Sequence, residues 1–292
     1  MDALLKIYPA DNVAVALRPL HAGEILPADG KELTLTTDVP AGHKVALRDL
    51  EPGEEVIKYG FPIGRTTAAI PLGSHVHTHN LRTQLGGEQS YAYHPRACGI
   101  AAQPPETFPG YLRENGAVGV RNELWILPTV GCVSDVAKAL ERKAQCLTGG
   151  GVEGVYAFSH PYGCSQMGED QENTRAILAD LACHPNAGGV LVLGLGCENS
   201  GVEEIQKRIP KEYERRIRYL VCQQADDEIE AGMKLLNELA DGMRGEKRTA
   251  CSVSKLVIGL KCGGSDGFSG ITANPVIGGF ADLLTAQGGS VI

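Results

Sequence analysis

The chain has 292 residues, which is enough for one large domain or two ordinary ones with a sizeable buried core. It carries 35 acidic and 27 basic residues, a net charge of −8, and only 5% aromatic residues. An acidic chain with no basic block and few aromatic rings is a poor binder of nucleic acids and anionic membranes, and no apolar run approaches the roughly 20 residues of a membrane helix. We therefore predict a globular protein with no nucleic-acid or membrane partner.

The cysteines indicate a reducing compartment. There are nine of them, an odd number, and they are scattered along the chain. The first residues lack the basic stretch followed by an apolar stretch that marks a signal peptide. We expect reduced thiols in a cytoplasmic protein, some of them available as metal ligands.

Residues 1–97 have the pattern of an all-β domain. Short runs rich in alternating or β-branched residues recur there. They are separated by a turn motif, apolar-x-x-Gly, that ends at Gly23, Gly42, Gly53 and Gly73. The spacing of the motifs is too uneven for a solenoid repeat, so we predict a compact β domain with tight turns.

Residues 98–117 contain Pro104-Pro105, Pro109-Gly110 and Asn115-Gly116 and show little periodicity. Such composition is typical of a linker between domains.

From residue 118 to 292, apolar runs alternate with helical patterns. Apolar strands without polar alternation, each followed by a helix, predict a parallel sheet covered on both faces. The predicted strands are 124–127, 154–158, 190–195, 217–221 and 256–260, and the predicted helices are 133–145, 171–183, 202–208, 226–243 and 275–287. Val291-Ile292 has the pattern of the start of another strand. The expected fold class is α+β with two domains.

Each of the five predicted strands is followed by a loop that holds a cysteine. These are Cys132, Cys164, Cys197, Cys222 and Cys262, and four of them have a glycine beside them. Ligands of open α/β sheets bind at the carboxyl ends of the strands, so the five thiols are expected at one edge of one sheet. Iron ligation, an iron–sulfur cluster and close packing around a substrate all suit this pattern, as do small buried residues beside tight turns.

Two nucleotide signatures are absent. Gly194-x-Gly196 lacks the third glycine of a dinucleotide fingerprint, and no phosphate-binding P-loop sequence occurs. The glycine-rich run 263–267 is compatible with a backbone nest for a carboxylate, or with a flexible turn.

A histidine cluster lies in the β domain. On a strand from Ser74 to Asn80, alternation would place His75, His77 and His79 on one face. Neutral imidazoles at this spacing suit a divalent metal or a general base, and the alternative is a solvated strand face. Lys58 is a weaker candidate for binding a carboxylate, because an exposed lysine is the ordinary expectation.

Several long strings resemble the altronate/galactarate dehydratase family. Those at 42–47, 56–64 and 75–80 resemble its N-terminal SAF domain, an antifreeze-like β-clip. Those at 119–132, 162–166, 194–199 and 262–275 resemble its following domain. The likeness runs through nearly the whole chain. It implies a SAF-like domain at 1–97, a linker at 98–117 and an α/β domain at 118–292 that is incomplete, because family members continue beyond this point.

The resemblance implies a hydro-lyase that dehydrates D-altronate, a small anionic sugar acid, to 2-dehydro-3-deoxy-D-gluconate in hexuronate catabolism. It also implies Fe²⁺, with Mn²⁺ as the alternative ion and an iron–sulfur cluster as a further alternative. Galactarate or sulfolactate as the substrate, and a non-catalytic sugar-acid-binding module, stay open. The resemblance leaves monomer and homo-oligomer open.

On this basis we expect one site between the domains. The catalytic candidates are His75, His77, His79, His160 and Glu198, and the candidate metal ligands are the first three of these with Cys164, Cys197 and Cys262. The substrate-binding candidates are Arg121, Asn199, Gly263, Gly264, Ser265, Asp266 and Asn274.

Overall fold

A computed structural model describes residues 3–84, 92, 94, 99–261 and 267–292. The chain divides into two compact units. The first unit comprises Met1–Ala101 and Gly259–Leu283, and the second comprises Ala102–Ile258 and Leu284–Ile292. Each unit is described by itself. No helix among the described residues is both long enough and apolar enough to cross a membrane.

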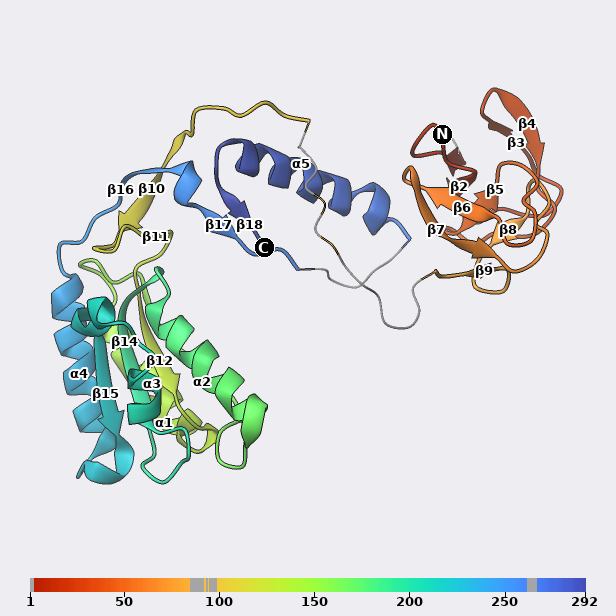
Figure 1. Cartoon of the computed structure of the whole chain (residues 1–292). Helices are drawn as coiled ribbons and strands as arrows, with labels where there is room; N and C mark the ends of the chain where they lie inside the picture. The colour runs from red at the N-terminus through yellow and green to blue at the C-terminus, as the bar shows by residue number, and fades with distance from the viewer. Residues whose placement is uncertain (1–2, 85–91, 93, 95–98, 262–266) are drawn as a thin grey trace. The chain divides into compact units, whose positions relative to one another are not determined.

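The N-terminal part of the first unit is built from short antiparallel strands (Figure 1). A four-stranded sheet has the order β1-β2-β5-β8, a second sheet has the order β6-β7-β9, and β3 and β4 form a separate hairpin. The strands are β1 (Leu4–Leu5), β2 (Val13–Ala16), β3 (Ile25–Ala28), β4 (Lys31–Thr34), β5 (Lys44–Ala46), β6 (Glu55–Lys58), β7 (Phe61–Thr66), β8 (His75–Val76) and β9 (Leu81–Arg82).

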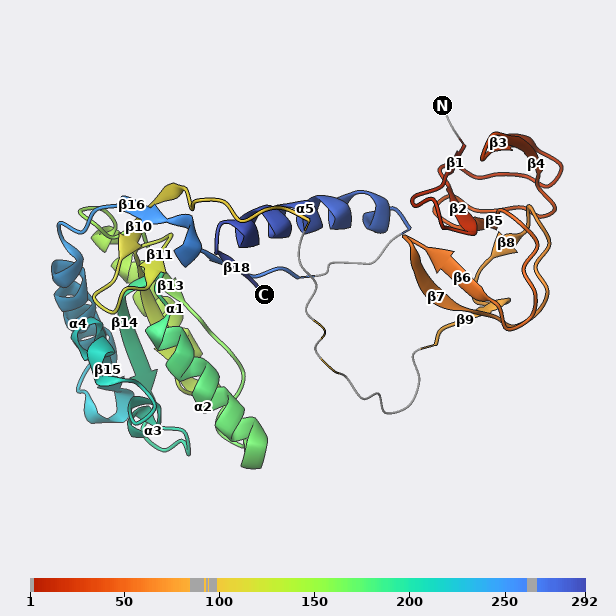
Figure 2. The same ribbon diagram turned by 45° about the horizontal axis from the view of Figure 1, so that its top comes forward.

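Figure 2 shows the two hairpins of this part, β3-β4 and β6-β7. Each of them turns through two residues with positive φ. Asp29 and Gly30 connect β3 to β4 at φ values of 50° and 74°, and Tyr59 and Gly60 connect β6 to β7 at 61° and 76°. Two successive positive φ values are the geometry of a type I′ turn, which matches the twist of antiparallel strands. Tyr59 is an unusual residue for this position, because residues other than glycine, asparagine and aspartate rarely adopt a positive φ. Its hydroxyl lies against Gly270.

The turn motifs form two matching pairs. Leu20 bridges Val39, and Leu50 bridges Ile70 in the same antiparallel manner about 30 residues further along the chain. Each pair lies in its own small core. The sequence excludes a solenoid repeat but does not reveal this duplication, because the uneven spacing between neighbouring motifs conceals an even spacing between alternate ones.

A C-terminal segment of the first unit packs against the N-terminal part. It includes a short 3-10 helix, Ser269–Ile271, and the start of α5 (Ala273–Ala286). A Cβ atom added at Gly270 would lie 2.1 Å from the Tyr59 hydroxyl, and one added at Gly42 would lie 3.3 Å from Gly267 Cα. The backbone of this segment therefore approaches the turn at Gly42 and the turn at Tyr59, at positions where only glycine fits.

The second unit contains the predicted parallel sheet. Its four strands, in the order β13-β12-β14-β15, pair in parallel throughout. They are β12 (Glu123–Pro128), β13 (Gly154–Ala157), β14 (Ala187–Gly194) and β15 (Ile217–Val221), so the first four predicted strands are confirmed. The five helices are also where the sequence predicts them: α1 (Ser134–Ala144), α2 (Gly168–Cys183), α3 (Val202–Gln206), α4 (Glu228–Met243) and α5.

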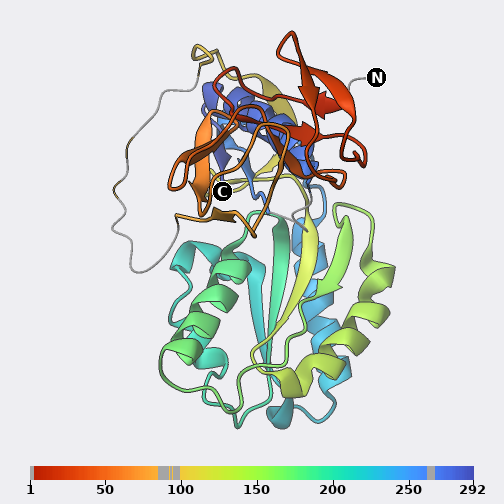
Figure 3. The same ribbon diagram turned by 90° about the vertical axis from the view of Figure 1, so that its right-hand side faces the viewer.

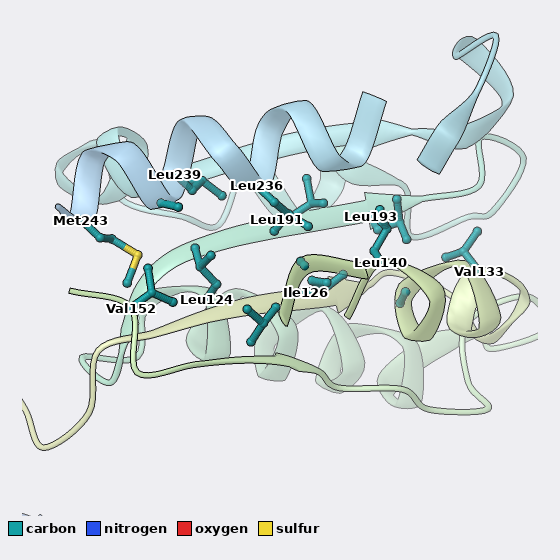
Figure 4. Packing of buried hydrophobic residues seen from close by; sticks show 14 of the residues in the cluster. Leu124, Ile126, Val133, Leu140, Val152, Leu191, Leu193, Leu236, Leu239 and Met243 are labelled. Atoms are coloured by element: carbon teal, nitrogen blue, oxygen red, sulfur yellow. The ribbon is translucent and has the colours of Figure 1, made fainter. Parts of the chain in front are cut away.

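Helices cover both faces of this sheet (Figure 3). On one face, side chains of α1 and α4 pack on Leu124, Ile126, Leu191 and Leu193, as Figure 4 shows. On the other face, α2 and α3 pack on the alternate side chains of the same strands. Burial of both faces is the physical reason why these strands are apolar at every position.

Two expectations for the second unit differ from the structure. The run 256–260 does not join the parallel sheet as a fifth strand. Its strand β17 (Val257–Ile258) pairs with β18 (Ser290–Val291) in a separate two-stranded sheet. Val257 is 58% exposed, whereas a strand inside the central sheet would be covered on both faces.

The segment 98–117 contains the six-residue strand β10 (Thr107–Leu112), which lies between β11 (Val118–Gly119) and β16 (Thr249–Ser252). Gly110 appears in the sequence as a turn residue. In the structure it is a packing residue, because a Cβ atom there would lie 2.6 Å from the Val118 side chain.

Candidate functional site

Four imidazoles gather in the first unit. The ring of His43 stacks on His77 with centroids 4.6 Å apart, and His75 lies 5.0 Å from His43, 5.5 Å from His77 and 5.2 Å from His79. His43 Nδ1 and His75 Nε2 are 2.9 Å apart and share a hydrogen bond. We call these four residues the histidine cluster. His43 is not among the candidate site residues predicted from the sequence. It joins the cluster because β5 and β8 pair as antiparallel strands, which places Val45 opposite His75, and the sequence does not show this pairing.

The predicted strand from Ser74 to Asn80 is wrong beyond Val76. His77 and His79 lie in a turn, and the side chain of Asn80 holds it. Asn80 Oδ1 accepts a hydrogen bond from the His77 amide, and Asn80 Nδ2 donates to the His75 carbonyl, each at 2.9 Å. The three histidines therefore converge because the chain turns back on itself, and Asn80 is a positioning residue that strand alternation could not reveal.

Two imidazoles of this cluster, those of His75 and His77, favour the neutral form. Burial and the neighbouring histidines lower the pKa of His75 to about 4, and burial with His43 and Lys44 lowers the pKa of His77. A neutral imidazole retains a free electron pair, so it can accept a proton or bind a metal. His77 Nδ1 is 3.0 Å from the Thr78 hydroxyl, an interaction that fixes the ring and leaves Nε2 for another partner.

Lys58 is not the exposed lysine that the sequence suggests. It ends β6, it is only 8% exposed, and its Nζ atom lies 4.5 Å from the centre of the Tyr59 ring. Burial and the charge of Lys58 lower the pKa of Lys44. Lys44 therefore lies beside His75 and His77 of the histidine cluster, and Lys58 lies close to Lys44.

In the second unit, three thiols meet at the carboxyl edge of the parallel sheet. Cys132, Cys164 and Cys197 follow β12, β13 and β14, and all three are exposed. The charge of Cys132 and a hydrogen bond between the two thiols raise the pKa of Cys164, with smaller effects from Cys197 and Glu198. The strands β13 and β14 flank β12 on opposite sides, so the strand order reverses at β12 and the thiols lie at the switch point where α/β sheets bind ligands.

The glycine before each of these cysteines permits close packing of the loops. A Cβ atom at Gly131 would lie 2.9 Å from the His160 carbonyl oxygen, and one at Gly163 would lie 3.0 Å from the Thr129 carbonyl oxygen. At Gly196 it would lie 2.9 Å from Gln223 Oε1. Gly163 and Gly196 also have φ values of +117° and +125°, which disfavour other residues. The glycine of each Gly-Cys pair thus allows the loops to pack closely, which brings the three thiols together.

Glu198 holds two of these loops in place. Its carboxylate accepts hydrogen bonds from the Thr129 hydroxyl at 2.6 Å, from the Gly196 amide at 2.6 Å and from the Leu195 amide at 3.0 Å. Burial raises the pKa of Glu198, but the hydrogen bonds from Thr129 and the backbone outweigh burial and lower it overall. With its oxygens engaged in this way, Glu198 is placed to position the loops rather than to transfer a proton.

Both ring nitrogens of His160 likewise have hydrogen-bond partners. Its Nε2 atom lies 2.8 Å from the Pro128 carbonyl, and its Nδ1 accepts a hydrogen bond from the Tyr162 amide at 3.2 Å. The ring therefore fastens the loop after β13 to the end of β12.

The remaining candidates are spread over the structure. Arg121 precedes β12 and lies at the amino edge of the sheet, a strand length of roughly 20 Å from the thiols. Asn199 shares the loop of Cys197, and Asn274 lies in the first turn of α5. Burial raises the pKa of Cys222, which follows β15, to about 11. Cys262, Gly263, Gly264, Ser265 and Asp266 lie outside the described residues, and the expected site between the domains stays a prediction.

The described residues do not form a complete metal site. Within the ranges 3–84, 99–261 and 267–292, no group of three or more His, Cys, Asp and Glu side chains is arranged to hold a metal ion. The chemistry of the donors is nevertheless suitable, because thiols and neutral imidazoles are ligands for iron.

Family models match the chain in three successive parts. Residues 2–84 match the altronate/galactarate dehydratase SAF domain, residues 110–244 match the second domain of D-galactarate dehydratase/altronate hydrolase, and residues 253–292 match the C-terminal region of D-galactarate/altronate dehydratase.

Known relatives agree with these models. The chain is 46% identical to altronate dehydratase of Bacillus subtilis and 48% identical to altronate dehydratase of Escherichia coli, over 100% and 99% of its own length. Galactarate dehydratase (L-threo-forming) of Escherichia coli is 33% identical over 99% of the chain. The chain spans about three fifths of the length of these relatives, 58–59% of each. Because the matches follow the same order and extend from end to end, the chain belongs to the altronate/galactarate dehydratase family.

Proposed function

We propose that this chain belongs to a hydro-lyase that removes water from D-altronate and yields 2-dehydro-3-deoxy-D-gluconate. The observation that carries the proposal is the identity of 46–48% to two altronate dehydratases, sustained along the whole chain. The lower identity of 33% to galactarate dehydratase makes galactarate the second candidate substrate.

The reaction needs a base for a weakly acidic proton. The hydrogen on C2 of an aldonate lies beside a carboxylate, and hydroxide must leave from C3. We assign the base to His77, because its pKa is lowered and the Thr78 hydroxyl engages its Nδ1, so Nε2 is available to take the C2 proton. General-base catalysis of this kind contributes roughly 10²–10⁴-fold to the rate.

The other imidazoles support His77. His43 stacks on the His77 ring, and the hydrogen bond of His43 to His75 fixes the orientation of the stacked pair. Asn80 holds the turn through the His77 amide and the His75 carbonyl. A base held in one orientation loses less entropy when the substrate arrives, which is a main source of enzymatic rate enhancement.

We also propose a bound metal, Fe²⁺ with Mn²⁺ or an iron–sulfur cluster as alternatives. When bound, it would supply a Lewis acid that polarises the substrate carboxylate and the departing hydroxyl. Among the described residues, the donors that suit iron are the thiols of Cys132, Cys164 and Cys197 and the imidazoles of His75 and His79. Iron content and visible absorption of the anaerobically purified protein test this part, and a metal-free protein with full activity would exclude it.

We further propose that the two units are a β-clip domain and an α/β domain, and that the protein works in the cytoplasm. The seven cysteines that the structure describes are all free, as expected where thiols stay reduced.

A panel of acid substrates tests the proposed reaction. The purified protein, supplied with Fe²⁺ under anaerobic conditions, is incubated with D-altronate, galactarate or sulfolactate, and the 2-keto acid product is measured. Turnover of D-altronate at a higher kcat/KM than galactarate supports the proposal. A preference for galactarate would make galactarate the proposed substrate in place of D-altronate. Binding of the acids with no turnover of any of them would contradict a hydro-lyase.

A further inference from the structure

Lys58 is a buried cation that has no counter-charge among the residues that the structure describes. Its side chain is more than nine-tenths buried, and among the described residues no hydrogen bond or ion pair joins its ammonium group to another residue. Lysine is almost never buried to this degree unless it is paired, because removing an ammonium group from water is costly. The face of the Tyr59 ring, 4.5 Å from Nζ, compensates only in part.

The nearby carboxylates are already engaged. Asp11, the buried acid close to this turn, accepts hydrogen bonds from the Gly60 amide at 2.8 Å and from the Tyr8 amide at 3.0 Å. Glu55, at the other end of β6, pairs with Arg65. Neither acid is within ion-pair distance of Lys58, so these two carboxylates of the described residues leave the cation unneutralised.

A second lysine adds to the positive charge. Lys44 begins β5 and is partly buried, and it too has no ion-pair partner among the described residues. It lies close enough to Lys58, His75 and His77 to influence their electrostatics. Two lysines beside neutral imidazoles therefore make a local positive site on a chain whose net charge is −8.

Gly267 and Gly270, in the C-terminal segment of the first unit, border this site on two sides. Gly267 approaches the turn at Gly42, two residues before Lys44, and Gly270 lies against the hydroxyl of Tyr59, the residue after Lys58. These close approaches restrict the movement of the turns next to both lysines. The cations are thus preorganised, which lowers the entropic cost of binding a small anion.

We propose that Lys58, assisted by Lys44, binds the carboxylate of the acid substrate and presents its C2 carbon to the histidine cluster. This inference rests on the proposed function for the identity of the acid. It assigns the carboxylate to the first unit, and not to Arg121, which lies at the amino edge of the sheet in the second unit. The ligand carboxylate would supply the negative charge that the described residues around Lys58 do not provide.

Binding of D-altronate to lysine variants tests the proposal. Isothermal titration compares the wild type with Lys58→Met, with Lys44→Met and with the matched control Lys31→Met, an exposed lysine on β4 of the same unit. Loss of a charge-assisted hydrogen bond predicts about 10- to 100-fold weaker binding for Lys58→Met, a smaller loss for Lys44→Met, and no change for Lys31→Met. D-Altritol, which has no carboxylate, should bind the wild type and Lys58→Met equally weakly.

Thermal unfolding without ligand separates binding from a structural role. Methionine fills a similar volume without the charge, so Lys58→Met should have a Tm equal to or above that of the wild type. A lower Tm, or D-altronate binding within twofold of the wild type, would overturn the proposal. Inorganic phosphate that binds as tightly as D-altronate would overturn the assignment to a sugar acid.

The same samples keep this inference apart from the proposed function. Binding of D-altronate that depends on Lys58, without product formation, would support the carboxylate site and contradict the hydro-lyase. Product formation by Lys58→Met at the wild-type rate would support the hydro-lyase and contradict the carboxylate site.

Discussion

Replacing Glu198 by alanine should destabilise the second unit by about 2–4 kcal/mol. The carboxylate accepts three hydrogen bonds, from the Thr129 hydroxyl and the amides of Leu195 and Gly196. Thr129 is fully buried, so losing its acceptor costs about 1–3 kcal/mol, while water can reach the two amides in part and each costs about 0.5 kcal/mol. Glu198→Gln keeps one acceptor oxygen and should cost about half as much.

The single tryptophan makes the measurement specific to this unit. Trp125 lies on β12 and is 6% exposed, so its fluorescence reports the unfolding of the parallel sheet. With an m value of about 2 kcal/mol/M, the loss in Glu198→Ala corresponds to a decrease of about 1–2 M in the urea midpoint. Glu141→Ala, in the middle of α1, is the matched control and should change the midpoint little.

The pH dependence gives a second test of the same interaction. Because folding lowers the pKa of Glu198, its contribution to stability is complete above its unfolded pKa of about 4.3 and is lost as the pH falls further. The difference between the wild type and Glu198→Gln should therefore shrink below that pH. A midpoint for Glu198→Ala within 0.3 M of the wild type would refute this assignment of a positioning role.

Three further outcomes are expected. Nuclear magnetic resonance titration should find His75 neutral down to about pH 4. Because His75 of the unfolded chain binds the proton more readily, the free energy of unfolding should fall as the pH decreases from about 6.5 to 4. An ordinary His75 pKa would contradict the packing of the cluster. Gly163→Ala should destabilise the second unit by about 1–3 kcal/mol, because the φ of +117° strains alanine and its Cβ atom would lie 3.0 Å from the Thr129 carbonyl oxygen. The loss should appear as a lower urea midpoint of Trp125 fluorescence. The control Gly242→Ala, on α4 with open space around it, should not lower the midpoint. Asn80→Ala should lower kcat at least tenfold and change the titration of His77, and an unchanged His77 titration would show that Asn80 does not hold the turn.

The parallel sheet could be predicted because both of its faces are buried. Its strands must be apolar at every position, and that pattern is visible in runs such as 190–195, which overlaps β14 (Ala187–Gly194). The cysteine loops could be located for the same reason, since a loop that follows a parallel strand has to lie at the carboxyl edge. The run 256–260 has a similar composition but contains only the two-residue strand β17, which pairs with β18 and not with an edge of the central sheet.

The histidine cluster shows what the sequence could not supply. Alternation on a strand suggests the right three histidines for the wrong reason, because the turn depends on hydrogen bonds of the Asn80 side chain. His43 joins them only through the pairing of β5 with β8, a register between segments about 30 residues apart. The burial of Lys58 likewise depends on tertiary packing at the Tyr59-Gly60 turn, which composition cannot reveal.

The rate at which His77→Gln dehydrates D-altronate tests the central claim most directly. The matched control is His21→Gln, a solvent-exposed histidine of the same unit outside the histidine cluster. We predict that the wild type and His21→Gln form 2-dehydro-3-deoxy-D-gluconate at equal rates, and that His77→Gln is slower by about 10²–10⁴-fold while binding the acid normally. Equal rates for His77→Gln and the wild type, or no product from the wild type, would contradict the account.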